Sequence, residues 1–234
     1  GGERERHPSR QRSWWRGSPP NRPVVSLSKM GHTSTPEFCT FHALRIKGFA
    51  TVETLGEMTG SDAATVQLHL DGLAAAAHAQ FREARSLWQL TPDGRAAYPA
   101  MLDADLDGAD LVALAPLYSS YLELNTEFKT LCGDWQLRNG GVNDHTDVAY
   151  DAAVIARLVN LDGRAQPVLV STAGLLDRLA SYGPRLASSI SRLQSGESNM
   201  FTGVMCGSYH DAWMELHEDL ILTQGIDRSA EGSF

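Results

Sequence analysis

Two histidines and a group of carboxylates near the C-terminus are the side chains best suited by type to hold a metal ion. His210 and His217 are seven residues apart in a predicted helix. Seven residues span about 10.5 Å of helical rise, which is too far for both imidazoles to bind one ion directly. The carboxylates beside them belong to Glu215, Glu218 and Asp219. We therefore predict a solvated acidic helix face bordered by histidines, with no metal and no cofactor. The alternative, a metal protein or helical-bundle enzyme, needs His145 or Asp147 from another helix.

Other residues that resemble catalytic groups have simpler structural explanations. Asn143, Asp144 and His145, with the pair Asp147 and Asp151, fit a helix cap and a solvated helix face better than acid–base machinery. The sequence contains no G-x-S-x-G elbow, no phosphate-binding P-loop and no G-x-G-x-x-G motif. These observations predict that the protein is not an enzyme.

A second set of residues has the chemistry to read DNA. Gln67 can form two hydrogen bonds with the edge of adenine in the major groove. Asp71, on the same predicted helix face, would repel phosphate. Residues 41–100 carry five basic and six acidic side chains, a net charge of −1. Because basic contacts to phosphate dominate DNA affinity, this charge predicts DNA binding that is weak or depends on dimerisation.

Two helices are predicted to position these residues. The first covers residues 52–59, and Gly60 suits its C-terminal cap because glycine adopts positive φ without strain. Ser61 or Asp62 can cap the second helix by accepting a hydrogen bond from its free amides. The buried stripe of the second helix, with spacings of four and three, consists of Val66, Leu70 and Leu73.

A hairpin and a further helix follow. Residues 81–83 and 87–90 have the pattern of two short strands. Thr91 is a suitable cap for the next helix, and Pro92 fits its first position because no amide donor is needed there. A helix over residues 36–47 is predicted to pack against this arrangement.

Residues 51–98 resemble the winged helix-turn-helix of MarR-like bacterial regulators, over about a fifth of the chain. The resemblance is carried by Thr65-Val66, Leu70, Leu73, Arg82 and the strand-to-helix junction Leu90-Thr91-Pro92-Asp93-Gly94-Arg95. It implies a DNA-binding fold. The DNA contacts that it implies come from Ser61, Ala63, Ala64, Gln67, Leu68, Arg82 and Arg85. Leu68 replaces a frequent basic residue and Ala77 a usual glycine, so a winged helix that binds proteins without direct DNA binding is the alternative.

The clearest periodicity in the chain lies in residues 110–138. Apolar side chains recur there at alternating spacings of three and four, as in helices that pack side by side. They are Leu114, Leu117, Tyr121, Leu124, Phe128, Leu131 and Trp135. Since Pro116 fits only near a helix start, we predict that the continuous helix begins at Ala115. Packing within a bundle and a dimer interface explain this seam equally well.

Further helices are predicted over residues 144–161, 166–182, from 184 onward, and from Ser208 to just before Gly225. The first would be capped by Asp144 and bury the stripe Val148, Ala152, Ile155 and Val159. Apolar pockets between helices are common ligand sites. Candidate pocket residues, which packing in the core explains equally well, are Tyr118, Tyr121, Trp135, Trp213 and Met214.

Composition limits the class of protein. The three cysteines are far apart, without a C-x-x-C motif, which predicts a reducing cytoplasm rather than a disulfide framework or zinc site. Cys132 is interpreted as a small hydrophobe rather than a nucleophile. No apolar run approaches the ~20 residues that span a bilayer. Residues 1–29 carry seven basic and two acidic side chains, hence +5, and residues 101–234 carry eight and nineteen, hence −11.

Together these observations predict a mainly α fold: an N-terminal winged helix-turn-helix with a small β-hairpin wing, followed by an all-helical C-terminal bundle. The predicted boundaries are 1–34 for a disordered basic arm or misassigned extension, 35–104 for the winged-helix domain, 105–225 for the bundle and 226–234 for a tail. The predicted function is a cytoplasmic transcriptional regulator without membrane contact. Its expected partners are double-stranded DNA, a second copy in a homodimer, and a small-molecule effector sensed by the bundle.

Overall fold

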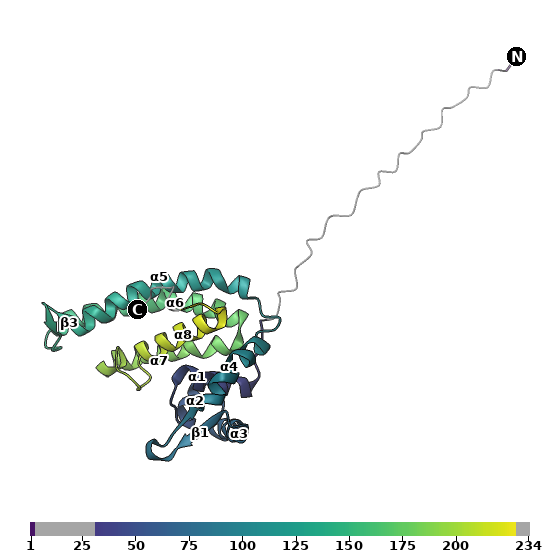
Figure 1. Ribbon diagram of the computed structural model, residues 1–234. Coiled ribbons are helices and arrows are strands. Elements are labelled where there is room, and N and C mark those ends of the chain that lie inside the picture. The colour runs from purple at the N-terminus through teal and green to yellow at the C-terminus, as the bar shows by residue number, and fades with distance from the viewer. Residues whose placement is uncertain (3–30, 228–234) are drawn as a thin grey trace.

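The computed structural model describes residues 1–2 and 31–227 as a mainly α-helical protein in which a winged part lies against a helical bundle (Figure 1). Most of the predicted arm and the tail from residue 228 lie outside the described residues. The winged part comprises α1 (Pro36–Lys47), α2 (Val52–Thr59), α3 (Ala63–Ala75), β1 (Ala79–Arg82), η1 (Glu83–Arg85), β2 (Leu87–Leu90) and α4 (Pro92–Asp105). The bundle comprises α5 (Leu111–Gln136), β3 (Leu137–Arg138), β4 (Gly141–Val142), α6 (Val148–Leu175), η2 (Asp177–Ser181), α7 (Tyr182–Gln194), η3 (Ser198–Met200) and α8 (Tyr209–Gln224).

Side-chain caps start the helices of the winged part where the sequence predicts them. The Thr51 hydroxyl accepts a hydrogen bond from the Thr54 amide at 3.2 Å, and Gly60 ends α2 in the left-handed conformation with φ 71°. Of the two candidate caps for α3, Asp62 takes the role, because its Oδ1 accepts from the Thr65 amide at 2.9 Å. The predicted bounds of α1 and α2 are confirmed.

The wing hairpin begins earlier than predicted. Its first strand starts at Ala79 rather than at residue 81 and ends at Arg82, whereas the second strand is as predicted. Ala79 pairs with Leu90, and both side chains are buried in the core of the winged part, which sets the register. The turn between the strands is η1, and Ser86 ends it with φ 53°.

The predicted heptad seam is buried inside the bundle of a single chain. Helices α5 and α6 are joined by the β3–β4 hairpin, and α7 and α8 pack beside them (Figure 1). The seam residues are buried, apart from the half-buried Leu117. Tyr121 and Phe128 contact Trp213 of α8, with ring centroids 4.8 and 5.2 Å apart. A dimer of this protein would therefore need a different surface.

Helix α5 begins at Leu111, four residues before the predicted start at Ala115. The Asp110 side chain caps it, so that Pro116 lies inside the helix. Proline cannot donate to the carbonyl four residues earlier, which here belongs to Val112. Because Val112 is 86% exposed, solvent can satisfy that carbonyl, and the helix tolerates the proline.

One continuous helix, α6, covers a region that the sequence predicts as two helices separated before Pro167. Pro167 leaves the carbonyl of Gly163 without its helical donor. Because Gly163 is exposed, solvent can satisfy that carbonyl, and the helix continues through the proline. The predicted helix over residues 166–182 instead ends at Leu175 and is followed by η2.

The start of α6 also differs from the prediction. Asp147, not Asp144, is its cap and accepts hydrogen bonds from the amides of Ala149 and Tyr150 at 3.1 and 3.0 Å. The predicted stripe is wrong, because the first turn extends beyond the core and Val148 is 77% exposed. Of its other members, Ala152 is exposed and Ile155 and Val159 are half-buried. The buried positions of α6 are Val154, Leu158, Leu161, Ala165, Leu169 and Thr172.

Helix α8 has the predicted ends but not the predicted surroundings. The Ser208 hydroxyl accepts from the Asp211 amide at 3.1 Å, and Gly225 ends the helix with φ 62°. The predicted solvated acidic face is wrong, because Glu215, His217 and Asp219 are buried. This happens because α8 is covered by the bundle on one side and by α1 on the other. Among the helices of residues 31–227, none is long and apolar enough to cross a membrane.

Candidate functional site

The predicted DNA-contacting residues of α3 share a surface at the end of the molecule that faces away from the bundle (Figure 1). Leu68 is 70% exposed at its centre. The amide nitrogen of Gln67 donates to Asp71 at 2.7 Å, which holds both side chains along the helix. The other predicted members are the half-buried Ser61 and the exposed Ala63 and Ala64. The surface therefore offers one amide among small apolar groups.

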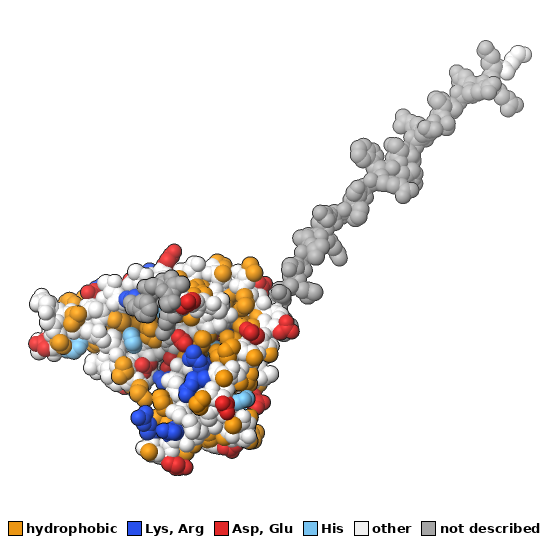
Figure 2. Space-filling model, in the orientation of Figure 1, with side chains coloured by type: hydrophobic (Ala, Val, Ile, Leu, Met, Phe, Trp, Pro, Cys, Tyr) orange, Lys and Arg blue, Asp and Glu red, His pale blue; other side chains and the backbone are white. Residues whose placement is uncertain are grey.

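The wing carries two guanidinium groups. Arg82 and Arg85 are both exposed. The Arg85 Cζ atom lies 5.5 Å from the ring centroid of Phe49, a cation–π contact that holds this guanidinium near the base of the wing. In the space-filling view, one group of basic side chains lies at the lower left of the molecule, where the wing lies, and a second lies nearer the middle of the face (Figure 2). Helix α3 itself carries no Lys or Arg, whereas the wing carries Arg82 and Arg85.

The candidate pocket residues of the bundle pack against neighbouring side chains. Tyr121 stacks on Trp213 with centroids 4.8 Å apart and on Tyr118 at 6.2 Å. These three side chains and Trp135 are buried in one hydrophobic core. Met214 is half-buried and lines a separate, open hollow on the surface. A ligand pocket formed by these five residues stays a prediction.

The polar residues before α6 form hydrogen bonds and ion pairs that stabilise the turn leading into this helix. His145 Nδ1 lies 2.9 Å from Asp151 Oδ2, and the amide of Asn143 donates to the other oxygen of Asp151 at 3.0 Å. Asp147 is paired with Arg138 at 2.6 Å. Within the described part of the chain, no group of three or more His, Cys, Asp or Glu side chains is placed to hold a metal ion.

The thiols of Cys39 and Cys132 are protonated at neutral pH. Burial raises the pKa of Cys132 to about 12. Burial and the nearby charge of Asp177 raise the pKa of Cys39 to about 11. Because the nucleophile is the thiolate, neither residue is activated, which agrees with the interpretation of Cys132 from the sequence.

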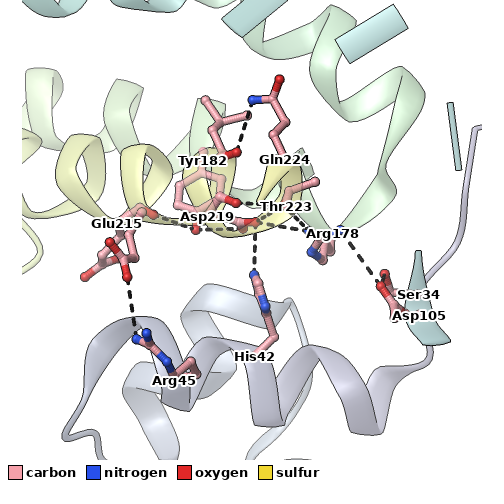
Figure 3. A network of polar contacts seen from close by, with 12 residues as sticks. Ser34, His42, Arg45, Asp105, Arg178, Tyr182, Glu215, Asp219, Thr223 and Gln224 are labelled. Atoms are coloured by element: carbon pink, nitrogen blue, oxygen red, sulfur yellow. Dashed lines mark hydrogen bonds and ion pairs between the residues drawn. The ribbon is translucent and has the colours of Figure 1, made fainter. Parts of the chain in front are cut away.

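A buried group of polar side chains joins the winged part to the bundle, and the sequence analysis did not identify it (Figure 3). At its centre is Asp219 of α8, which is 2% exposed. His42 Nε2 of α1 and Arg178 Nη2 of η2 lie 2.9 and 3.2 Å from the same carboxylate oxygen of Asp219. The Tyr182 hydroxyl donates to the other oxygen at 3.1 Å. The Tyr98 hydroxyl lies 2.7 Å from His42 Nδ1. We call these five residues the polar joint.

The charges in the polar joint keep Asp219 ionised. Burial alone would raise the pKa of this carboxyl, but the charges of His42 and Arg178 outweigh burial and hold the pKa well below its usual range. Burial, followed by the charge of Asp219, raises the pKa of Tyr98 and Tyr182, so both phenols remain protonated. A buried ion is tolerated only while its partners remain in place, so this carboxylate couples three elements that are distant in sequence.

A second carboxylate of α8 extends the contact. Glu215 lies one helical turn before the central carboxylate of the polar joint. Its Oε1 is 2.6 Å from Lys47 Nζ at the end of α1, and its Oε2 is paired with Arg185 of α7. Arg45 of α1 lies 3.5 Å from Glu218. One edge of α8 therefore holds α1, η2 and α7 through charged contacts.

A cavity of about 290 Å³ opens beside the polar joint, between the winged part and the bundle. The wall formed by α1 and the end of α2 is mainly apolar and consists of Cys39, His42, Ala43, Ile46, Met58, Thr59 and Gly60. The wall formed by the bundle is mainly polar and consists of Asp177, Arg178, Ala180, Ser181, Tyr182 and Asp219. The cavity thus has an apolar side and a side with hydrogen-bonding groups.

Two signals in the sequence point to this contact. Buried apolar residues in α8 occur beside the expected stripe as well as within it, for example Ala212 and Ile221, which is the pattern of a helix covered on more than one side. In α1, basic side chains at His42, Arg45 and Lys47 have spacings that complement the acidic residues of α8. Recognising the pair, however, requires knowing that two helices so distant in the chain are neighbours.

Neither a protein-family model, nor a curated protein, nor a solved structure matches this chain. The functional argument therefore rests on the geometry of α3, the wing, the polar joint and the cavity.

Proposed function

We propose that this protein is a DNA-binding regulator in which α3 enters the major groove and the wing contacts the backbone beside it. The observation that carries the proposal is the placement of α3 and the wing. Helices α1 and α2 contact the bundle, whereas α3 and the hairpin face away from it (Figure 1). A duplex can therefore approach α3 without meeting the bundle, as docking of a recognition helix requires.

The chemistry of the surface suits a few base contacts. Gln67 has an amide for the edge of adenine, and the exposed Leu68 can contact the methyl group of thymine. Arg82 and Arg85 would contact phosphate from the wing. Because these arginines carry most of the positive charge near α3, we expect two copies of the protein to share one operator, so that the contacts of both wings add.

The test is DNA binding by the full chain, measured by fluorescence anisotropy at about 50 and about 200 mM salt, a range in which phosphate contacts change affinity strongly. The DNA is the region upstream of the protein's own coding sequence, together with duplexes selected from a random pool. The paired substitution of Arg82→Ala and Arg85→Ala should lower the salt-dependence slope by about 2, because each lost phosphate contact removes about 1.

The matched control is Arg164→Ala, which removes an exposed arginine of the bundle that is paired with Glu127. This variant should bind DNA as the unsubstituted protein does. Absence of sequence-specific binding to either source of DNA, or an unchanged slope in the doubly substituted wing, contradicts the proposal.

The alternative is a winged part that docks onto a protein without direct DNA binding. The observation that favours it is the exposed apolar centre of α3, where Leu68 stands among small residues with little positive charge. The substitution Leu68→Arg distinguishes DNA binding from protein docking. In a DNA-binding protein the added guanidinium should raise DNA affinity several-fold, because it can form roughly one more contact with a phosphate or a guanine. In a protein-docking module the same change should leave DNA binding absent.

A further inference from the structure

We infer that Asp71 makes α3 select a cytosine close to the base that Gln67 contacts. The inference rests on the proposed DNA-binding function and adds a second specificity-determining residue to the same surface. Three features of the structure support it: the position of Asp71 on the exposed face of α3, the single partner of its carboxylate, and the small number of hydrogen-bond donors around it.

Asp71 lies on the same face of α3 as the residues proposed to contact bases. It follows Gln67 by four residues and Leu68 by three, and these spacings place side chains next to one another on a helix surface. Leu68 is 70% exposed, and Asp71 is exposed as well. The other side of α3 is buried in the core of the winged part. A duplex that contacts Leu68 therefore also meets the Asp71 carboxylate.

The Asp71 carboxylate has one partner and one unused oxygen. Gln67 Nε2 donates to Asp71 Oδ1 at 2.7 Å, and among the residues that the structure describes this is the only hydrogen bond or ion pair of Asp71. Helix α3 contains no lysine or arginine that could pair with the carboxylate. Asp71 Oδ2 is therefore left as an acceptor at the surface where the proposed function brings a base edge.

Asp71 also fixes the orientation of the Gln67 amide. Because an ionised carboxylate can only accept hydrogen bonds, Gln67 turns its Nε2 atom toward Asp71 and leaves its carbonyl oxygen, Oε1, for the duplex. One further N–H of Nε2 remains, since an amide nitrogen carries two hydrogens. Together the two side chains present two acceptor oxygens and one donor.

Other polar side chains of α3 add few donors to this face. The Thr65 hydroxyl donates to Asp62 at 3.0 Å, within the cap of the helix. His69 is half-buried, and its Nδ1 lies 2.8 Å from the Thr40 hydroxyl of α1. The exposed face of α3 is thus richer in acceptors than in donors.

Such a face selects bases that present amino groups. In the major groove, adenine and cytosine each have an amino group, whereas guanine and thymine present oxygen acceptors that repel a carboxylate. Gln67 suits adenine, because Oε1 can accept from its amino group while the remaining N–H donates to N7. Asp71 suits cytosine, because that base presents an amino group without an adjoining acceptor.

The spacing of the two residues limits the distance between the two bases. Four residues correspond to about 6 Å of helical rise, and successive base pairs are about 3.4 Å apart. We therefore expect the cytosine within about two base pairs of the adenine. At a site without this cytosine the carboxylate lacks a donor and still repels phosphate, so Asp71 lowers the affinity for incorrect sites.

The first test compares the sequences that the full chain selects from a random pool of duplexes. The unsubstituted protein should select sites with an adenine and a cytosine within about two base pairs. Gln67→Ala should lose the preference for adenine and keep that for cytosine. Asp71→Ala should lose the preference for cytosine. The matched control is Asp103→Ala, which removes another exposed carboxylate of the winged part, on α4, and should keep both preferences.

The second test removes one amino group from the DNA. The base 2-pyrimidinone lacks only the amino group of cytosine, and it replaces the selected cytosine in the best duplex. Fluorescence anisotropy should show about tenfold weaker binding by the unsubstituted protein and by Asp103→Ala, the effect of one lost hydrogen bond to a charged group. The same replacement should leave binding by Asp71→Ala unchanged, since this variant has no carboxylate to lose a donor.

The outcomes separate this inference from the proposed function. Specific sites without a cytosine, no weakening by 2-pyrimidinone in the unsubstituted protein, or equal weakening in Asp71→Ala each overturn the role of Asp71 and leave DNA binding in place. Absence of any sequence-specific binding overturns the proposed function and this inference with it. Thermal unfolding checks that each variant is folded, which we expect because the substituted side chain of Asp71 is exposed.

Discussion

At the scale of single residues, Asp219 shows how a charge is kept inside this protein. Its two carboxylate oxygens face a histidine, an arginine and a tyrosine from α1, η2 and the start of α7. Each partner comes from a different element, so none can be removed without leaving the others incompletely paired. Removing one partner of a buried ion pair is far more destabilising than removing a surface pair.

Asp219→Asn tests this arrangement. The substitution keeps the size of the side chain but removes the negative charge that balances Arg178, so we expect a loss of about 3–5 kcal/mol in the free energy of unfolding. Urea unfolding followed by circular dichroism measures it. The control is Glu197→Gln, which breaks the exposed pair with Arg192 and should leave stability unchanged within error. Equal effects of the two substitutions would show that the polar joint is not a stabilising contact.

The same residue predicts a dependence of stability on pH. Since the pKa of Asp219 in the folded protein is held well below the ~3.9 of an unfolded chain, its contribution is complete above about pH 4 and declines as the pH falls below that value. The stability difference between the unsubstituted protein and Asp219→Asn should therefore narrow as the pH falls below about 4. If the stability difference already becomes smaller as the pH is lowered from about 7 to about 5, a titrating group other than Asp219 is responsible.

At the scale of elements, local signals predicted helix ends well where a cap is made by a neighbouring side chain. Thr91 is a cap as the sequence indicates, and Thr51 and Ser208 cap helices whose predicted starts are confirmed. Two of the errors in helix extent come from prolines, Pro116 and Pro167, that were read as helix boundaries. In each case the residue whose carbonyl loses its donor, Val112 or Gly163, is exposed to solvent, and that exposure follows from packing rather than from local sequence.

Two helical glycines are expected to change stability in opposite directions when each is replaced by alanine. Gly163→Ala should stabilise the protein by up to about 1 kcal/mol, because alanine is the better helix former and no atom stands near the added Cβ. Gly94→Ala in α4 should destabilise it by about 1–3 kcal/mol or more, because its Cβ would stand 2.0 Å from the His78 carbonyl oxygen. Thermal and urea unfolding check both. A destabilising Gly163→Ala would indicate that α6 is interrupted there.

At the scale of the whole molecule, the described residues form two hydrophobic cores, one in the winged part and one in the bundle. Their contact includes charged groups of α1 and α8, together with the apolar Leu106 and Leu222, which pack against the core of the winged part. The order of helices, and the seam that holds α5 in the bundle, were predictable from periodicity. The polar joint was not, because its partners are as distant in the chain as His42 and Asp219, and no local pattern reports such a pairing.

Glu215→Gln should loosen this contact without unfolding either core. The amide cannot balance the charges of Lys47 and Arg185, so hydrogen exchange in α1 and α8 should become about tenfold faster, while α5 and α6 keep their protection. Exchange followed by mass spectrometry resolves these segments. Glu127→Gln, which breaks the exposed pair with Arg164, is the control. Uniformly faster exchange in all helices would mean that the two parts unfold as one unit.

The position of α8 in the chain has a consequence for synthesis on the ribosome. Helix α1 is made first, but its charged partners on α8 follow more than 160 residues later, roughly 10–30 s at ordinary elongation rates. During that interval His42, Arg45 and Lys47 face solvent, which hydrates charged groups well. At these three positions a newly made winged part exposes charged groups rather than the apolar groups that make half-finished domains aggregate. The charged character of this contact thus suits a partner that arrives late.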